Sequence, residues 1–180
     1  DANGGTIEKG YAVLNADGKV DALPNPTAPD ALHDFEGWFT EREGGRKVSA
    51  AEKFADGNKL YAHWKLNTSW NEADFTTDGD TVTGLTEAGK AKLAVNPDLK
   101  IPAVIGGRAI RKIGAGAFSP SKTGNKTINT IAISMGIEEI GQAAFSGANL
   151  KMLEVPSSVK IIGRMAFNGA PLEQVKFSEG

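Results

Sequence analysis

Two histidines, His33 and His63, are by type the side chains best suited to move a proton at neutral pH or to bind a metal ion. Neither belongs to a recognisable serine or acid motif, and His63 stands between Ala62 and Trp64 in an alternating, strand-like run. The 180-residue chain has no cysteine, which excludes a disulfide, a thiolate metal ligand and a cysteine nucleophile. We interpret His63 as an ordinary strand residue and expect neither histidine to be a catalytic base or a metal ligand.

Three carboxylates, those of Asp74, Asp78 and Asp80, gather around Gly79 and are of the type that binds calcium. A calcium loop, however, needs several oxygen ligands at fixed spacing and usually a bidentate acid after them. Here Asp78-Gly79-Asp80 runs directly into a threonine-rich segment, which fits a hairpin turn better. We expect a hairpin at this position, with no metal and no cofactor.

Paired glycines at Gly106-Gly107 and at Gly114-x-Gly116 resemble the composition of phosphate-binding loops. A P-loop requires a Lys-Ser or Lys-Thr pair after the glycines, and a dinucleotide site requires a strand–turn–helix unit around them. The sequence provides neither. Because an Ile-Gly pair recurs in every repeat described below, we interpret these glycines as structural bends.

The three tryptophans, Trp38, Trp64 and Trp70, are residues that stack on carbohydrate in some binding sites. Trp38 and Trp64 belong to strand motifs, where an aromatic side chain more often fills the core. Trp70 lies in the segment that connects the N-terminal part of the chain to the C-terminal half. It is therefore our candidate for a domain junction or an exposed contact.

The elements that would position these residues are revealed by internal repeats in the C-terminal half. An Ile-Gly-x-x-Ala-Phe box occupies residues 113–118, 140–145 and 162–167. A second motif, apolar at its first, fourth and sixth positions, occupies residues 128–133, 150–155 and 172–177. The second motif therefore returns every 22 residues, while the first two boxes are 27 residues apart. The five extra residues lie within 119–126, whose composition is typical of a polar loop.

This spacing predicts a solenoid of short coils that stack around one core. The alternation in Leu153-x-Val155 predicts a strand with one apolar face, and an irregular earlier copy is Leu99-x-Ile101-Pro102. Residues 164–167, followed by a glycine, predict a single helical turn. The phenylalanines that end the boxes should run through the core; they are Phe118, Phe145 and Phe167.

Residues that interrupt the apolar pattern of these strands point away from the core. They should line one continuous face, which solenoid curvature makes the default binding surface. No charge stripe marks this face, and such residues are often only solvated. The six outward positions, our candidates for ligand binding, are Thr130, Ala132, Met152, Glu154, Gln174 and Lys176.

The N-terminal part has different patterns. Alternating or aromatic residues predict strands at 11–15, 35–39 and 60–64. Asp17-Gly18 predicts a hairpin turn after the first of them, and the prolines that follow predict an extended loop. The spacing Ser49-x-x-Glu52 is that of a capping box, so that a short helix is expected near Ala50. Residues 67–98 predict a connector and a lead-in to the repeats, with a helix over 86–94.

Two resemblances follow from these motifs. Residues 1–66 resemble the internalin B-type, or Listeria–Bacteroides, repeat through Asp-Ala-Asn-Gly-Gly at the start, Phe-x-Gly-Trp-Phe at 35–39 and Leu-Tyr-Ala-x-Trp at 60–64. Residues 99–180 resemble the BspA-like leucine-rich repeats through the three boxes and the strand motifs between them. The resemblances imply an α+β chain: a small β-grasp-like sheet module followed by a short leucine-rich-repeat α/β solenoid.

The resemblances also imply a secreted or wall-attached bacterial cell-surface protein whose relatives take part in adhesion. We expect a non-catalytic, adhesin-like fragment that binds a host or bacterial surface protein, since no nucleophile–base or metal arrangement is evident. The alternative is a passive spacer that displays another domain. A net charge of −2 argues against nucleic acid, and no apolar run is long enough to insert into a membrane. Both ends should be cut from a longer protein that carries the targeting and anchoring segments.

Overall fold

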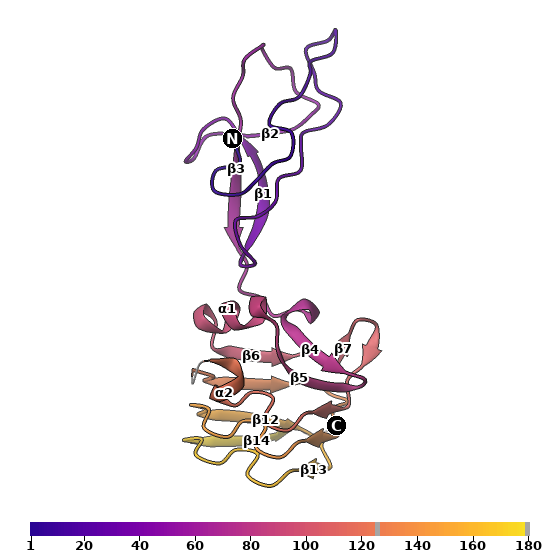
Figure 1. The fold of residues 1–180 in the computed structure, drawn as a ribbon, viewed down its shortest axis with the longest axis vertical. Coiled ribbons are helices and arrows are strands. Elements are labelled where there is room, and N and C mark those ends of the chain that lie inside the picture. Colours follow the sequence, from indigo (N-terminus) through magenta and orange to yellow (C-terminus); the bar gives the residue numbers. More distant parts are fainter. Residues whose placement is uncertain (125–126, 179–180) are drawn as a thin grey trace. The chain divides into compact units, whose positions relative to one another are not determined.

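The computed structural model describes residues 1–124 and 127–178, and the chain divides into two compact units, Asp1–Asn67 and Thr68–Gly180 (Figure 1). Strands make up most of the regular structure, and the helices are few and short. The expected α+β class is therefore too loose. The chain is mostly β, with a mixture of parallel and antiparallel pairing.

The first unit is built on an antiparallel sheet in which β1 is the central strand and β2 and β3 flank it. The strands are β1 (His33–Phe39), β2 (Lys47–Val48) and β3 (Tyr61–Leu66). They confirm the predicted strands at 35–39 and 60–64. Trp38 is buried with Val48 and Ala62, and Trp64 packs against them, so that the two tryptophans fill the core as expected.

The predicted strand at residues 11–15 is wrong. Tyr11 and Val13 are 67% and 74% exposed, and this segment has no strand structure. The turn that should follow it does form, because the side-chain oxygen of Asn15 accepts hydrogen bonds from the backbone N–H groups of Asp17 and Lys19. Alternation alone did not produce a strand, because no neighbouring strand satisfies the backbone of this segment.

The predicted helix near Ala50 is also wrong. Half of the capping box forms, since the backbone N–H of Ser49 donates to the Glu52 carboxylate at 2.9 Å. The chain makes only a turn there, and Glu52 also pairs with Arg46. So short a segment cannot sustain a helix without an apolar face to pack.

The second unit contains two sheets, which we call the front sheet and the back sheet. The front sheet consists of β6 (Asp98–Ile101), β10 (Thr130–Ile133), β12 (Met152–Pro156) and β14 (Gln174–Ser178). The back sheet consists of β4 (Phe75–Asp78), β5 (Thr81–Leu85), β9 (Lys112–Ile113), β11 (Glu139–Ile140) and β13 (Ile161–Ile162). All neighbours are parallel except β4, which pairs antiparallel with β5.

The 22-residue period is confirmed by the register of these strands. In the front sheet Ile131 pairs with Leu153, which in turn pairs with Val175. In the back sheet the box isoleucines Ile113, Ile140 and Ile162 pair in the same way. Each repeat therefore contributes one strand to each sheet, and neighbouring repeats lie directly on one another (Figure 1).

The phenylalanine that ends each box runs through the core between the sheets, as predicted. Phe118 and Phe145 are fully buried and stack with ring centroids 5.2 Å apart, and Phe145 stacks on Phe167 at 5.4 Å. Phe75, from the segment before the repeats, meets the edge of Phe118 at 6.4 Å. Residues 68–98 thus contribute to the same core, through Phe75 and through Leu93 of α1 (Glu87–Val95).

The helical turn expected at residues 164–167 does not form. Met165 has φ 58° and Ala143, at the same place in the preceding box, has φ 53°, a left-handed conformation in which an α-helix cannot continue. Backbone groups here bond to the next coil instead: the N–H groups of Ala143 and Phe145 donate to the carbonyls of Arg164 and Ala166. The chain makes consecutive turns that join one repeat to the next.

The glycine of each Ile-Gly pair has a structural role, but not that of a bend. A Cβ atom on Gly141 would lie 2.7 Å from the carbonyl oxygen of Ile113, and one on Gly163 would lie 2.5 Å from the nitrogen of Gln142. The backbone of the preceding coil passes too close for any side chain. By contrast, Gly106 and Gly107 do form a turn, with φ of 57° and 74°, between β7 (Val104–Ile105) and β8 (Arg108–Ala109).

The remaining predictions for this unit concern its helices and its first hairpin. Asp78-Gly79-Asp80 joins β4 to β5 as a hairpin, as expected. The expected helix over 86–94 is α1, whose N-terminal cap is the Thr86 side chain. The five-residue insertion was expected to be a polar loop, but it contains a single helical turn, α2 (Pro120–Thr123); Asn125 and Lys126 lie outside the described residues.

Candidate interaction surface

The six outward residues predicted from the repeats form two rows across the front sheet. Because β10, β12 and β14 are parallel and in register, Thr130, Met152 and Gln174 lie side by side. Ala132, Glu154 and Lys176 form the second row, two residues further along each strand. Alternate residues of a strand point to the same side of a sheet, so that both rows lie on the face opposite the core. Thr130 and Met152 are half-buried, and the other four are exposed.

Two further residues of this surface, Asp98 and Lys100, were not among the predicted positions. They lie on β6, which pairs with β10 so that Asp98 stands beside Thr130 and Lys100 beside Ala132. The Thr130 hydroxyl donates a hydrogen bond to the Asp98 carboxylate at 2.9 Å. The signal was available, because Leu99-x-Ile101 has the alternation of the other strands and defines its own outward positions.

We call these eight residues the front face. Among the described residues, none of the salt bridges involves a member of it. Glu154 accepts a hydrogen bond from the Ser178 hydroxyl at 2.7 Å. The charges of Lys100, Glu154 and Lys176 alternate in sign along one row and remain available to a partner. The eight residues of the front face are Asp98, Lys100, Thr130, Ala132, Met152, Glu154, Gln174 and Lys176.

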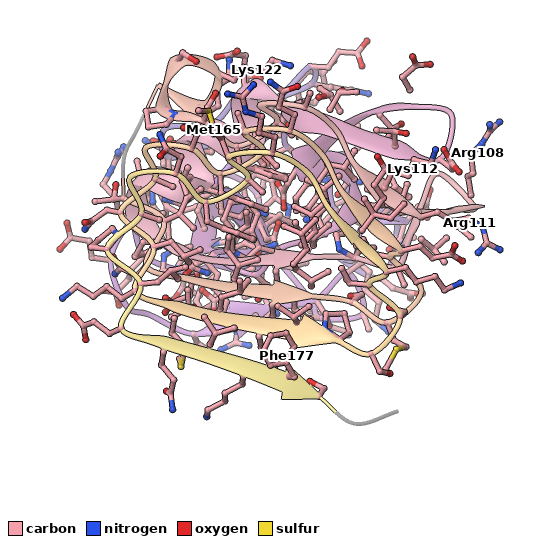
Figure 2. All side chains as sticks on the ribbon, turned by 90° about the horizontal axis from the view of Figure 1, so that it is seen from below. Arg108, Arg111, Lys112, Lys122, Met165 and Phe177 are labelled. Atoms are coloured by element: carbon pink, nitrogen blue, oxygen red, sulfur yellow. The ribbon has the colours of Figure 1, made fainter. Side chains whose placement is uncertain are left out.

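Charged residues near the back sheet are instead paired between neighbouring coils. Arg111 lies 2.7 Å and Lys160 lies 3.6 Å from the Glu138 carboxylate, and Lys112 lies 3.6 Å from Glu139. Arg108, Arg111 and Lys112 lie together at one edge of the unit, away from the strand that carries Phe177 (Figure 2). These contacts link neighbouring coils through ion pairs, whereas none of the described salt bridges involves the front face.

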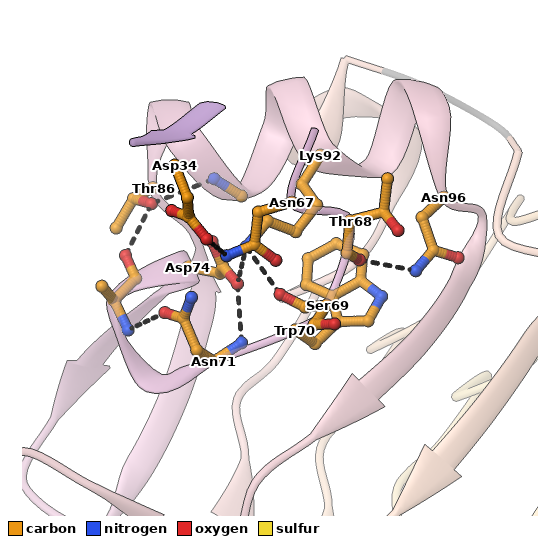
Figure 3. Close-up of polar contacts among 12 residues, drawn as sticks. Asp34, Asn67, Thr68, Ser69, Trp70, Asn71, Asp74, Thr86, Lys92 and Asn96 are labelled. Atoms are coloured by element: carbon orange, nitrogen blue, oxygen red, sulfur yellow. Dashed lines mark hydrogen bonds and ion pairs between the residues drawn. The ribbon is translucent and has the colours of Figure 1, made fainter. Parts of the chain in front are cut away.

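Asp74, considered above as a calcium ligand, is buried and paired with a lysine. Its carboxylate lies 2.7 Å from the Lys92 ammonium, and the two side chains are 3% and 2% exposed (Figure 3). It also accepts the backbone N–H of Asn71 at 2.8 Å, while Lys92 donates to the carbonyl of Ser69 at 2.8 Å. Sequence reasoning missed this pair, because a lysine on a short helix is normally solvated. Among the described residues no cluster of three His, Cys, Asp or Glu side chains could hold a metal ion.

Trp70 packs within the second unit, and its indole N–H has a backbone partner. Its indole N–H donates to the backbone carbonyl of Asp98 at 2.7 Å, and its ring lies 5.8 Å from that of Phe75. It packs against the core of the repeat unit, half-buried. Its indole hydrogen bond and its contact with Phe75 hold Trp70 against this core, and its role at a domain junction or in an exposed contact stays a prediction.

The two histidines occupy strands of the first unit. His63 stacks on Phe39 with ring centroids 3.9 Å apart, and its Nε2 atom lies 2.9 Å from the carbonyl oxygen of Glu41. His33 bonds to the Asp30 carboxylate at 2.7 Å, and this hydrogen bond lowers the pKa of Asp30. The interpretation of His63 as a strand residue is confirmed.

In-register parallel strands with one apolar and one polar side, stacked coil upon coil, are the geometry of a repeat protein. Residues 100–180 match the family model described as BspA type leucine rich repeat region (6 copies). This match confirms the resemblance of the C-terminal half, whereas the internalin B-type interpretation of residues 1–66 stays a prediction.

The chain is also similar to a solved structure, that of the pneumococcal vaccine antigen PcpA. The two share 22% sequence identity with a TM-score of 0.33, over 58% of this chain and 35% of that one. The chain therefore spans about a third of the length of that protein. No curated protein matches the chain. Among the described helices none is long and apolar enough to cross a membrane.

Proposed function

We propose that the second unit is a leucine-rich-repeat solenoid that binds another protein through the front face, without catalysing a reaction. The observation that carries the proposal is the in-register alignment of outward side chains from β6, β10, β12 and β14. A face built in this way presents side chains at fixed spacing on a rigid support, and it spans several repeats at once.

The partner we propose is a host or bacterial surface protein, and the setting is the outside of a bacterial cell. The family match supports this setting. The composition of the front face suits a protein partner, because its members mix a threonine, a methionine and uncommitted charges of both signs. Protein interfaces combine an apolar centre with a polar rim in this way. Met152, half-buried between Thr130 and Gln174, would lie near the apolar centre.

A triple substitution tests this proposal. Replacing Met152, Glu154 and Lys176 by alanine removes the apolar contact and two uncommitted charges from the front face. We expect the affinity for a ligand found by screening surface proteins to fall at least about tenfold, or roughly 1.4 kcal/mol. Isothermal titration calorimetry with the intact chain measures the change.

The matched control changes three residues near the back sheet, Lys112, Glu139 and Lys160, to alanine. Lys112 and Glu139 lie on β9 and β11, and Lys160 lies directly before β13, away from the front face. This variant also loses three charged side chains, but its affinity for the ligand should be unchanged. An affinity that survives the first triple substitution, or that falls equally in both variants, would show that the ligand does not bind the front face.

A further inference from the structure

One row of the front face crosses four parallel strands at nearly even spacing. Its members, which we call the charged row, are Lys100, Ala132, Glu154 and Lys176, and each is paired in register with the next on β6, β10, β12 and β14. All four side chains are exposed. Because neighbouring strands lie about 4.8 Å apart, the charged row is a line about 14 Å long that runs across the strands.

The spacing of the charged row matches the turns of an α-helix. A helix rises about 5.4 Å per turn, so that one laid across the strands places one residue of its inner face over each strand. Residues i, i+4, i+7 and i+11 of such a helix share one face and span about 16 Å. An extended chain fits less well, since residues on one of its faces are about 6.6 Å apart and fall out of step with the strands.

The charges of the row determine which side chains this helix would carry. Within the described residues, Lys100, Glu154 and Lys176 take part in no salt bridge. Glu154 accepts a hydrogen bond from the Ser178 hydroxyl at 2.7 Å, which leaves its negative charge in place. Two basic side chains at the ends and an acidic one between them attract the opposite series of charges: acid, base, acid.

Ala132 is the one uncharged member of the row. Its side chain is the smallest of the four, so that a longer apolar side chain of the partner has room between Lys100 and Glu154. Met152 is half-buried and stands diagonally beside Ala132 on the neighbouring strand, β12. A leucine at this point of the helix would contact both Ala132 and Met152, and would supply the apolar centre that a protein interface needs.

We propose that the front face binds an amphipathic α-helix of its protein partner, laid across β6, β10, β12 and β14. The inner face of this helix has an acid at i, an apolar residue at i+4, a base at i+7 and an acid at i+11. The acids lie over Lys100 and Lys176, and the apolar residue lies over Ala132. Docking of a helix through residues at such intervals is a general mode of protein recognition. This inference rests on the proposed function, because it describes the partner of the same surface.

The test uses the intact chain and a peptide that carries the proposed pattern, acetylated at its N-terminus and amidated at its C-terminus. The peptide is Ala-Ala-Glu-Ala-Ala-Gln-Leu-Ala-Ala-Lys-Gln-Ala-Ala-Glu-Ala-Ala. In an NMR titration the amide signals of Thr130, Ala132 and Met152 should shift in a saturable manner. The exchanged peptide, in which each Glu becomes Lys and the Lys becomes Glu, should bind at least about tenfold more weakly, because like charges then face each other. A third peptide, with proline in place of the alanine after leucine, should not bind, because proline breaks the helix.

Charge reversal in the chain locates the site. Lys100→Glu should weaken the first peptide about fivefold and strengthen the exchanged peptide, because the charge beneath one end of the helix changes sign. Stronger binding of the exchanged peptide cannot result from misfolding of the variant. Lys65→Glu is the matched control, the same change at an exposed lysine of β3 in the first unit, and should alter neither affinity.

Failure of this inference can be told apart from failure of the proposed function. Equal affinity of the native chain for the first and the exchanged peptide, or equally tight binding of the proline peptide, would overturn the helix pattern. The pattern is also overturned if no peptide binds while a protein ligand loses affinity in the triple variant of Met152, Glu154 and Lys176. In that case the front face binds a partner of another shape, and the proposed function stands.

Discussion

Phe145→Ala is expected to lower the free energy of unfolding of the repeat unit by about 3–5 kcal/mol. The Phe145 side chain is fully buried, and its ring stacks on Phe118 on one side and on Phe167 on the other. Alanine would leave a cavity in the middle of the stack and remove both ring contacts. Urea unfolding, followed by amide hydrogen exchange in β10 and β12, would measure the loss in this unit alone.

The matched control is Phe177→Ala, the same chemical change on β14, where the side chain is 75% exposed. It should change the stability by no more than about 0.5 kcal/mol. If Phe145→Ala unfolds the unit outright, Phe145→Leu preserves most of the volume and should cost about 1.5 kcal/mol or less. Equal effects of the two alanine substitutions would contradict the assignment of the phenylalanine column to the core.

Removing either member of the buried pair of Asp74 and Lys92 should destabilise the repeat unit by about 3–5 kcal/mol. Each single substitution, Asp74→Leu or Lys92→Met, leaves the other charge buried without its counter-ion. The double variant should be more stable than either single variant, because two apolar side chains can pack where the pair lay. It should remain about 1 kcal/mol below the native chain, because Asp74 also caps the N–H of Asn71.

Thermal unfolding of the native chain, the two single variants and the double variant measures the coupling energy between Asp74 and Lys92. The comparison pair is Lys112 and Glu139, which lie 3.6 Å apart with partly exposed side chains, and whose removal should cost at most about 1 kcal/mol. If the effects of Asp74→Leu and Lys92→Met simply add in the double variant, the two groups do not depend on each other as the structure indicates.

The sequence predicted the parts of the fold that repeat. The strands of the front sheet and the column of box phenylalanines follow from a 22-residue period, because a side chain that faces the core in one coil must do so in the next. The same reasoning predicted the six front-face residues on β10, β12 and β14. Asp98 and Lys100 were not predicted, because the first coil has a longer connection than the others and its repeat pattern is irregular.

The parts that could not be predicted depend on contacts between distant segments. Ala143 and Met165 lie in a left-handed conformation that their residue types disfavour. Their two coils are joined there by hydrogen bonds from the N–H groups of Ala143 and Phe145 to the carbonyls of Arg164 and Ala166. The buried position of Lys92 depends on Asp74, 18 residues earlier in the chain. Tyr11 and Val13 alternate as a strand should, yet lack a partner strand. In each case the tertiary environment outweighed the local pattern.

The most direct test of the front face as an interaction surface is a single bulky substitution at its centre. Ala132 is exposed and stands in one row between Lys100 and Glu154, so that Ala132→Trp would block close approach while leaving every charge in place. Ala109 is an exposed alanine on β8, outside the front sheet, and Ala109→Trp is the matched control. Calorimetric affinities for the same protein ligand, with unfolding temperatures measured in parallel, compare the two variants. We predict that Ala132→Trp weakens binding at least about tenfold and that Ala109→Trp does not; unchanged binding in a folded Ala132→Trp variant would contradict the account.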